Sequence, residues 1–447
     1  MTLAAPVRMR SVGWALVPLG LMFLAVGLSP ALVLPFMSLF LSTAVHAGPV
    51  RVTVFLVAAP LAGVVAASVI GRLSDRRAIR RLILVGAAVA GLVGTGLTAF
   101  VRDYWVLLGL TVTATAVAGS LFPQTFAYAR QILERDDPAR VAVGISAMRT
   151  VFSLAWVAGP PVGALMLDLG GFRLVYGLAA AMYALAALVA LFRLEEVGVA
   201  GGPAPVEGRD GLMAERPERA ERAERAEGAE RVEGAERAEG AERAEGAERA
   251  EGAERAEGAE PPRAVLLLTA LAFVLLQVPL TLGVQALPLF VGQDLHRGAS
   301  EAGVILGLCA ALEIPLMLGL GTLTTRFRLR TLILVGGACG VAYYAAASVT
   351  PNIWVLGAAQ VVNAFFIAAV SGVGISYMQD LMPGRPGRAT TLFTNTFPVG
   401  AVVAGPLFGV AAQVGYRSAY AMGALLCAAG LLLLLLVRPA AGVGAGG

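Results

Sequence analysis

The sequence predicts an all-α membrane protein with twelve transmembrane helices in two pseudo-symmetric halves of six helices each. Apolar residues make up 57% of the 447 residues and charged residues only 14%, whereas about a quarter of the residues in soluble domains are charged. Spans of roughly 20 apolar residues, the length that crosses a bilayer, recur along the chain. The second half of the chain also repeats features of the first, which indicates a duplicated bundle.

Twelve apolar spans can be marked off, each long enough to form one membrane-crossing helix. The first follows Arg8 and Arg10 and has the charge pattern of a signal peptide, but eleven further spans and a polar Ser29–Pro30 pair favour an uncleaved helix. The spans divide the chain into an N-terminal half (1–196), a charged linker (197–262) and a C-terminal half (263–447). They cover approximately residues 12–43, 52–71, 82–100, 104–128, 141–167, 172–192, 264–291, 300–324, 331–349, 353–378, 389–413 and 417–437.

Two pairs of segments show the duplication directly. Residues 71–86 read GRLSDRRAIRRLILVG, and residues 321–336, which lie 250 positions later, read GTLTTRFRLRTLILVG. AGPPVG at 158–163 similarly returns as AGPLFG at 404–409, and each copy is followed by the pattern G-[FY]-R-x-x-Y. Duplicated membrane bundles with a site between their halves are mostly transporters.

The distribution of arginine predicts the orientation of the bundle. With the N-terminus in the cytoplasm, 18 arginines outside the linker fall in cytoplasmic loops and tails. This asymmetry places both termini and the linker inside the cell. The net charge of +4 combines −8 in residues 207–260 with +12 elsewhere, so the basic balance reflects topology and we expect no nucleic-acid partner. Only five arginines fall in external loops: Arg51, Arg102, Arg173, Arg297 and Arg417.

The linker is dominated by a repeating RAEGAE hexad that offers no apolar stripe for packing. We interpret it as a charged tether of marginal helicity, with a partner-docking arm as the alternative. The three cysteines, Cys309, Cys339 and Cys427, fall inside predicted spans without metal-ligand spacing, and both histidines fall in external loops. The sequence therefore predicts no metal site, no cofactor and no enzymatic activity.

The loop at residues 71–81 resembles the signature G-x-x-x-D-[RK]-x-G-[RK]-[RK] between the second and third helices of the major facilitator superfamily. Gly71, Asp75 and Arg76 match it, and Arg80 and Arg81 supply further positive charge. Glycine lets helices approach closely, and the carboxylate can pair with an arginine or cap a helix end. We expect this cluster to form a cytoplasmic gate that opens as the halves move. A loop that only sets the topology is the alternative.

Glu313 is the one carboxylate, and Arg149 the one arginine, that lie well inside predicted spans. At ~1.5 Å per residue, Arg149 lies about 12 Å and Glu313 about 15 Å from the cytoplasmic ends of their helices. An ionisable group at this depth is costly unless it is paired or hydrated. In this fold we expect the fifth and eighth helices to face each other, and Arg149 and Glu313 to form an interdomain pair across them. The pair would form in one state and separate in another, where Glu313 could take a proton. A permanent structural ion pair or a snorkelled charge is the alternative.

A set of amide and aromatic side chains lies at mid-span and carries little charge. Amides hydrogen-bond hydroxyl groups and aromatic rings stack on CH faces, so the set suits an uncharged polyhydroxylated ligand. The alternative is that each residue holds neighbouring helices together. The candidate substrate-binding residues are Gln124, Trp156, Gln277, Gln285, Asn363 and Asn395.

Four longer runs carry a narrower resemblance: LFPQTFAYAR (121–130), RTVFSLAWVAGPP (149–161), LEIP (312–315) and QDLMPGRPGRATTLFTNT (379–396). They resemble the sugar efflux transporter family within this superfamily. The resemblance covers both halves and excludes the linker. It implies alternating access and the export of mono- and disaccharides or their glycosides against an inward proton flow, and it places Arg149 and Glu313 within family motifs.

We therefore expect a monomeric sugar exporter of a bacterial inner membrane, whose partners are the sugar, protons and the lipid bilayer. A multidrug-type exporter of the same fold is the first alternative, but it favours a larger and more aromatic cavity than a chain with four tryptophans offers. A non-transporting membrane receptor or scaffold is the second. It would need neither the gating loop nor the buried charges.

Overall fold

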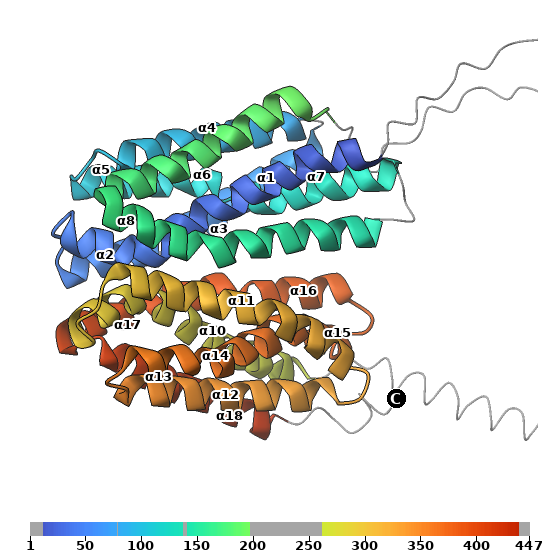
Figure 1. The fold of residues 1–447 in the computed structure, drawn as a ribbon. Helices are drawn as coiled ribbons and strands as arrows, with labels where there is room; N and C mark the ends of the chain where they lie inside the picture. The colour runs from blue at the N-terminus through green and yellow to red at the C-terminus, as the bar shows by residue number, and fades with distance from the viewer. Residues whose placement is uncertain (1–11, 78, 137–140, 197–261, 438–447) are drawn as a thin grey trace, which may run out of the picture.

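The computed structural model describes residues 12–77, 79–136, 141–196 and 262–437. Both ends of the chain and nearly all of the charged linker lie outside these ranges. Within them the chain consists of helices and short loops, and Figure 1 shows the helices in two groups, the first half (blue to green) beside the second (yellow to red).

The helical segments follow the predicted spans. Those of the first half are α1 (Val12–Val33), η1 (Leu34–Phe36), α2 (Met37–Thr43), α3 (Pro49–Arg76), α4 (Arg80–Thr98), α5 (Tyr104–Leu110), η2 (Thr111–Thr115), α6 (Ala116–Ala118), α7 (Leu121–Asp136) and α8 (Val141–Arg193). Those of the second half are α10 (Arg263–Leu289), η4 (Phe290–Asp294), α11 (Ala299–Leu323), α12 (Leu329–Val349), α13 (Ile353–Ala358), α14 (Gln360–Ile367), η5 (Ala368–Val373), α15 (Gly374–Asp380), α16 (Pro386–Thr394), α17 (Thr396–Val414) and α18 (Arg417–Leu436).

The described part contains 11 helices that are long and apolar enough to cross a membrane. One of them, α8, has 53 residues and is interrupted by non-helical backbone at Gly170 and Gly171. A straight helix of that length would measure about 80 Å, against a hydrocarbon core of about 30 Å. The chain turns back at this point (Figure 1), so the two arms of α8 are the predicted fifth and sixth spans.

The glycine of the repeated G-[FY]-R-x-x-Y pattern has a conformational role in both halves. Gly171 has φ +68° and Gly415 has φ +119°, backbone angles that side-chain-bearing residues rarely adopt. Each glycine lets the chain leave one membrane-crossing helix and enter the next within a few residues. The sequence repeat is therefore also a repeat of backbone geometry.

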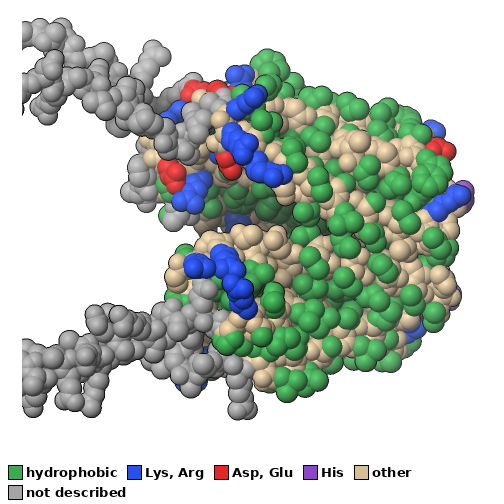
Figure 2. All heavy atoms as spheres, turned by 180° about the vertical axis from the view of Figure 1, so that it is seen from behind, with side chains coloured by type: hydrophobic (Ala, Val, Ile, Leu, Met, Phe, Trp, Pro, Cys, Tyr) green, Lys and Arg blue, Asp and Glu red, His purple; other side chains and the backbone are tan. Residues whose placement is uncertain are grey.

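The surface of the bundle is apolar around its middle and charged at its ends. Figure 2 shows hydrophobic side chains over the sides of the molecule, with arginine and carboxylate side chains gathered mainly at one end. Val65 and Leu318, for example, are 63% and 72% exposed. An apolar surface of this extent is suited to lipid rather than to water.

The two ends of the bundle differ in charge and in packing. We call the end where α3 meets α4 and α11 meets α12 the arginine-rich end, and the opposite end, where α2 meets α3 and η4 meets α11, the arginine-poor end. At the arginine-poor end the halves are in contact, because α2 and η1 pack on α10. The hydroxyl of Ser38 there donates a hydrogen bond to the carbonyl oxygen of Gln285.

Glycines allow two further contacts between the halves near the arginine-poor end. On α11, Cβ atoms added at Gly303 and Gly307 would lie 2.6 Å and 2.8 Å from the backbone oxygens of Pro160 and Val157 on α8. On α17, a Cβ at Gly405 would lie 2.7 Å from the side chain of Val57 on α3. The glycine–proline segments 159–163 and 405–409 thus lie at interfaces between the halves, where glycine permits close packing of helices.

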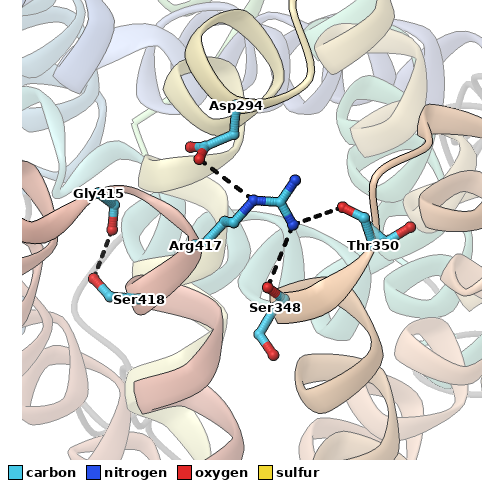
Figure 3. Close-up of polar contacts among 6 residues, drawn as sticks. All are labelled: Asp294, Ser348, Thr350, Gly415, Arg417 and Ser418. Carbon is cyan, nitrogen blue, oxygen red and sulfur yellow. Dashed lines mark hydrogen bonds and ion pairs between the residues drawn. The ribbon is translucent and has the colours of Figure 1, made fainter.

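An arginine of the second half ties three helices together at the arginine-poor end (Figure 3). The guanidinium of Arg417 lies 3.5 Å from Asp294 at the end of η4, and it donates to the carbonyl oxygens of Thr350 and Ser348 at 2.8 and 3.5 Å. It also lies over the ring of Phe290. These contacts hold the end of the α10–η4 crossing, which packs against the first half.

At the arginine-rich end the halves separate. Figure 2 shows the surface hollowed between them at the end where the arginine side chains gather. The bundle is therefore closed at the arginine-poor end and open at the arginine-rich end in this conformation.

Candidate functional site

Four of the six candidate substrate-binding residues are buried amides. Gln124 on α7 is 6% exposed, Gln277 and Gln285 on α10 are 2% and 9% exposed, and Asn363 on α14 is 8% exposed. Each has one buried side-chain atom without a hydrogen-bond partner: Gln124 Oε1, Gln277 Nε2, Gln285 Oε1 and Asn363 Oδ1. A buried polar atom without a partner is costly, so these atoms are suited to groups that a ligand brings.

The other two candidates lie in different surroundings. Trp156 is half-buried on α8, and Asn395 is exposed between α16 and α17. Because Gln124 and Trp156 lie in the first half and the other four in the second, a shared ligand would contact both halves. A separate cavity of about 70 Å³ inside the first half is lined by Ser29, Thr95 and Tyr183, among others, and by none of the six candidates.

Glu313 and Arg149 come from the helices that pack across the interface between the halves. From the contact of Gly307 with Val157, α11 continues six residues to Glu313 and α8 runs back eight residues to Arg149, both toward the arginine-rich end. At ~1.5 Å per residue these steps are about 9 Å and 12 Å. The two residues therefore lie at similar depth on facing helices, and the expectation that these helices face each other is confirmed.

The two charges interact without forming a close pair. Among the ion pairs of the described residues, none joins Glu313 to Arg149. Arg149 is nevertheless the cation that acts electrostatically on Glu313. Glu313 is half-buried and Arg149 is exposed. A modest closing movement of the halves at the arginine-rich end would bring them closer.

The contacts of the predicted gate loop with other described residues lie within the first half in this conformation. Arg80 is buried, donates to the hydroxyl of Ser74 at 2.9 Å and lies 3.5 Å from Asp75. Arg81 donates to the carbonyl oxygens of Ala190 and Leu191 at the end of α8. The loop thus joins the ends of α3, α4 and α8.

Two other gate residues contribute little to packing here. A Cβ at Gly71 would meet no heavy atom within 4 Å, so the close helix approach expected at this glycine does not occur in this conformation. Arg76 is exposed at the end of α3. Both observations fit a gate loop that is separated from the second half, since the hollow between the halves opens at this end (Figure 2).

We predict that Asp75→Asn shifts the protein further toward the state open at the arginine-rich end and leaves folding nearly unchanged. The side chain of Asp75 is 77% exposed, and an exposed ion pair contributes only about 0–1 kcal/mol to stability. Gly71→Cys supplies a probe in open space, and its rate of maleimide labelling should rise in the Asp75→Asn variant. Asp168→Asn, which alters an exposed carboxylate at the arginine-poor end, is the control. Equal labelling rates in all three proteins would reduce the loop to a determinant of topology.

The sequence did not reveal a hydrogen-bond network around Asn363. Gln360 and Tyr343 are 1% and 4% exposed, and Cys309 is 6% exposed. Asn363 Nδ2 donates to Gln360 Oε1 at 3.0 Å and to Cys309 Sγ at 3.3 Å, and Gln360 Nε2 donates to the Tyr343 hydroxyl at 3.0 Å. The spacing of Gln360 and Asn363, three residues apart on one helix face, was the available signal.

Comparison with known proteins identifies the family. The sequence profile of the Major Facilitator Superfamily matches residues 19–232 and 269–445. The chain belongs to the Major Facilitator Superfamily. It also belongs within it to the sugar efflux transporter family, because it is 32% identical to a putative sugar efflux transporter of Deinococcus radiodurans over 92% of this chain and 94% of that one.

Other relatives and solved structures agree with this assignment. The chain is 31% identical to sugar efflux transporter A of Dickeya chrysanthemi, over 90% of this chain and 91% of the relative. It is 30% identical to sugar efflux transporter A of Escherichia coli, over 92% of this chain and 93% of the relative. The crystal structure of the nucleoside transporter NupG matches with a TM-score of 0.67 at 12% identity, over 95% of this chain and 98% of that one. That likeness shows the fold alone.

Proposed function

We propose that this protein exports sugars, namely mono- or disaccharides or their glycosides, by alternating access. The observation that carries the proposal is the set of buried amides with unpaired atoms on α7, α10 and α14. A sugar offers many hydroxyl groups that can both donate and accept hydrogen bonds, and so can satisfy such atoms without bringing charge. Relatives named as sugar efflux transporters support the same substrate class.

The proposed orientation places the arginine-rich end in the cytoplasm of a bacterial cell, by the positive-inside rule. The described conformation is then open to the cytoplasm and closed outside, the state in which an exporter receives its substrate. Closure of the cytoplasmic end would bring the gate loop at residues 71–81 against the second half. The contacts of Gly307 and Gly405 with the first half would then separate, and the sugar would be released outside.

Coupling to protons is the second part of the proposal. Among the carboxylates of the described residues, Glu313 lies well inside a membrane-crossing helix, and Arg149 lies on the helix that faces it. In the proposed cycle Glu313 exchanges its interaction with Arg149 for a proton as the halves move. An inward flow of protons would thereby drive the outward flow of sugar.

Counterflow in proteoliposomes tests the substrate class. Vesicles preloaded with unlabelled glucose or lactose should take up the labelled sugar faster than vesicles without protein. Lipophilic cations should neither move nor compete. Uptake of cations without competition by any sugar would favour a multidrug-type exporter instead. Failure of a correctly inserted protein to move either class would favour the receptor or scaffold.

A further inference from the structure

Asn363 differs from the other buried amides because its NH2 group is already engaged. Nδ2 donates to Gln360 Oε1 and to Cys309 Sγ, so both donor positions are occupied. Among the described residues, the side-chain NH2 groups of Gln124, Gln277 and Gln285 donate no hydrogen bond. The orientation of the Asn363 amide is thus fixed, while its Oδ1 atom remains without a partner.

Gln360 anchors this arrangement. Its Nε2 atom donates to the hydroxyl of Tyr343 and to the carbonyl oxygen of Leu356 at 3.0 and 3.3 Å. Because the carbonyl oxygen of Leu356 can only accept, it requires Nε2 on its side, and Gln360 Oε1 then faces Asn363 as an acceptor. A buried and satisfied network of this kind fixes one geometry.

The position of the network places it beside the proposed coupling site. Cys309 lies four residues before Glu313 on α11, so the two side chains lie on the same face of that helix. The α11 and α14 helices pack together, and Asn363 bridges them through Cys309. The unpaired Oδ1 atom therefore lies near the level of Glu313, about one turn closer to the arginine-poor end.

We propose that Asn363 Oδ1 is a dedicated acceptor for one hydroxyl group of the transported sugar, and that Gln360 and Cys309 are positioning residues that hold it in this role. The proposal rests on the proposed function. Because the amide cannot turn its NH2 group toward the ligand, the site requires a donor at that position of the sugar. Oδ1 is out of contact with solvent in this conformation, so the hydroxyl group reaches it only when the side chains around Asn363 rearrange on ligand binding.

The chemistry of the ligand gives a direct test. Competition against labelled glucose is measured in proteoliposomes with singly deoxy and singly deoxyfluoro glucose analogues substituted at each hydroxyl-bearing carbon. A fluorine atom can accept a weak hydrogen bond but cannot donate one. At one position the deoxy and deoxyfluoro analogues should both bind on the order of 10-fold more weakly than glucose, because each leaves the buried oxygen unpaired.

Variants assign that position to Asn363. In Asn363→Leu the preference for glucose over both analogues should disappear at that position alone, and in Gln360→Leu it should fall several-fold because the amide is free to turn. Gln413→Leu, which changes an exposed amide on α17, should keep the full preference. A protein that transports glucose but shows the same preferences in Asn363→Leu as in the parent would overturn the inference. Failure of the parent protein to transport any sugar would instead overturn the proposed function.

Discussion

Glu313→Gln is expected to abolish sugar transport driven by a pH gradient and to preserve sugar exchange at equal pH on both sides. Glutamine has nearly the shape of glutamic acid but cannot bind and release a proton in this range. The sugar could still cross as the halves move, because exchange needs no net proton flow. The two activities are compared in the same proteoliposome preparation, with and without an imposed gradient.

Arg149→Ala should reduce both activities, because it leaves Glu313 without the cation that acts on it across the interface. Glu301→Gln provides the matched control, since Glu301 lies in the first turn of the same helix at the arginine-poor end. That variant should keep both activities. Full gradient-driven transport by Glu313→Gln would show that this residue is structural and that coupling lies elsewhere.

Gly307→Ala is expected to lose most transport activity because it forces the halves apart at the arginine-poor end. The added Cβ would lie 2.5 Å from Pro161 Cγ and 2.8 Å from the backbone oxygen of Val157. Overpacking of this kind costs about 1–3 kcal/mol, which lowers the equilibrium constant for the closed interface roughly 5- to 150-fold. Gly319→Ala on the same helix meets no atom within 4 Å and should remain active.

The shift of conformation can be measured separately from activity. Ser38 is fully buried at the contact of α2 with α10, so Ser38→Cys should resist a membrane-impermeant maleimide added from the outside. Labelling should increase when Gly307→Ala is added and stay low with Gly319→Ala. If the Gly307→Ala variant transported sugar at the parent rate and its Ser38→Cys form were labelled like the parent, the interface would tolerate the added methyl group. The closed geometry would then need revision.

Much of the fold could be predicted because it depends on local composition. Apolar spans, turn glycines such as Gly171 and Gly415, and the repeat at 250 positions all act within single helices or loops. The facing of the fifth and eighth spans followed from the fold, and the contact of Gly307 with Val157 confirms it. The boundary between the fifth and sixth spans, predicted between residues 167 and 172, coincides with the non-helical backbone at Gly170 and Gly171.

The candidate site was less predictable because burial depends on packing between helices. Gln124, Gln277 and Asn363 could be chosen as mid-span amides, and they are buried with unpaired atoms. The engagement of the Asn363 NH2 group was hidden, because Cys309 lies 54 positions earlier on another helix. Asn395, like Asn363, is an amide in the middle of a predicted span, but its side chain is exposed in this conformation.

Uphill transport tests the central claim most directly. In everted membrane vesicles, whose interior corresponds to the outside of the cell, an acid interior should drive labelled sugar inward above its external concentration. The accumulated sugar should leave when a protonophore collapses the gradient. Accumulation that is independent of the gradient, or movement of sugar only down its own concentration difference, would contradict proton-driven export.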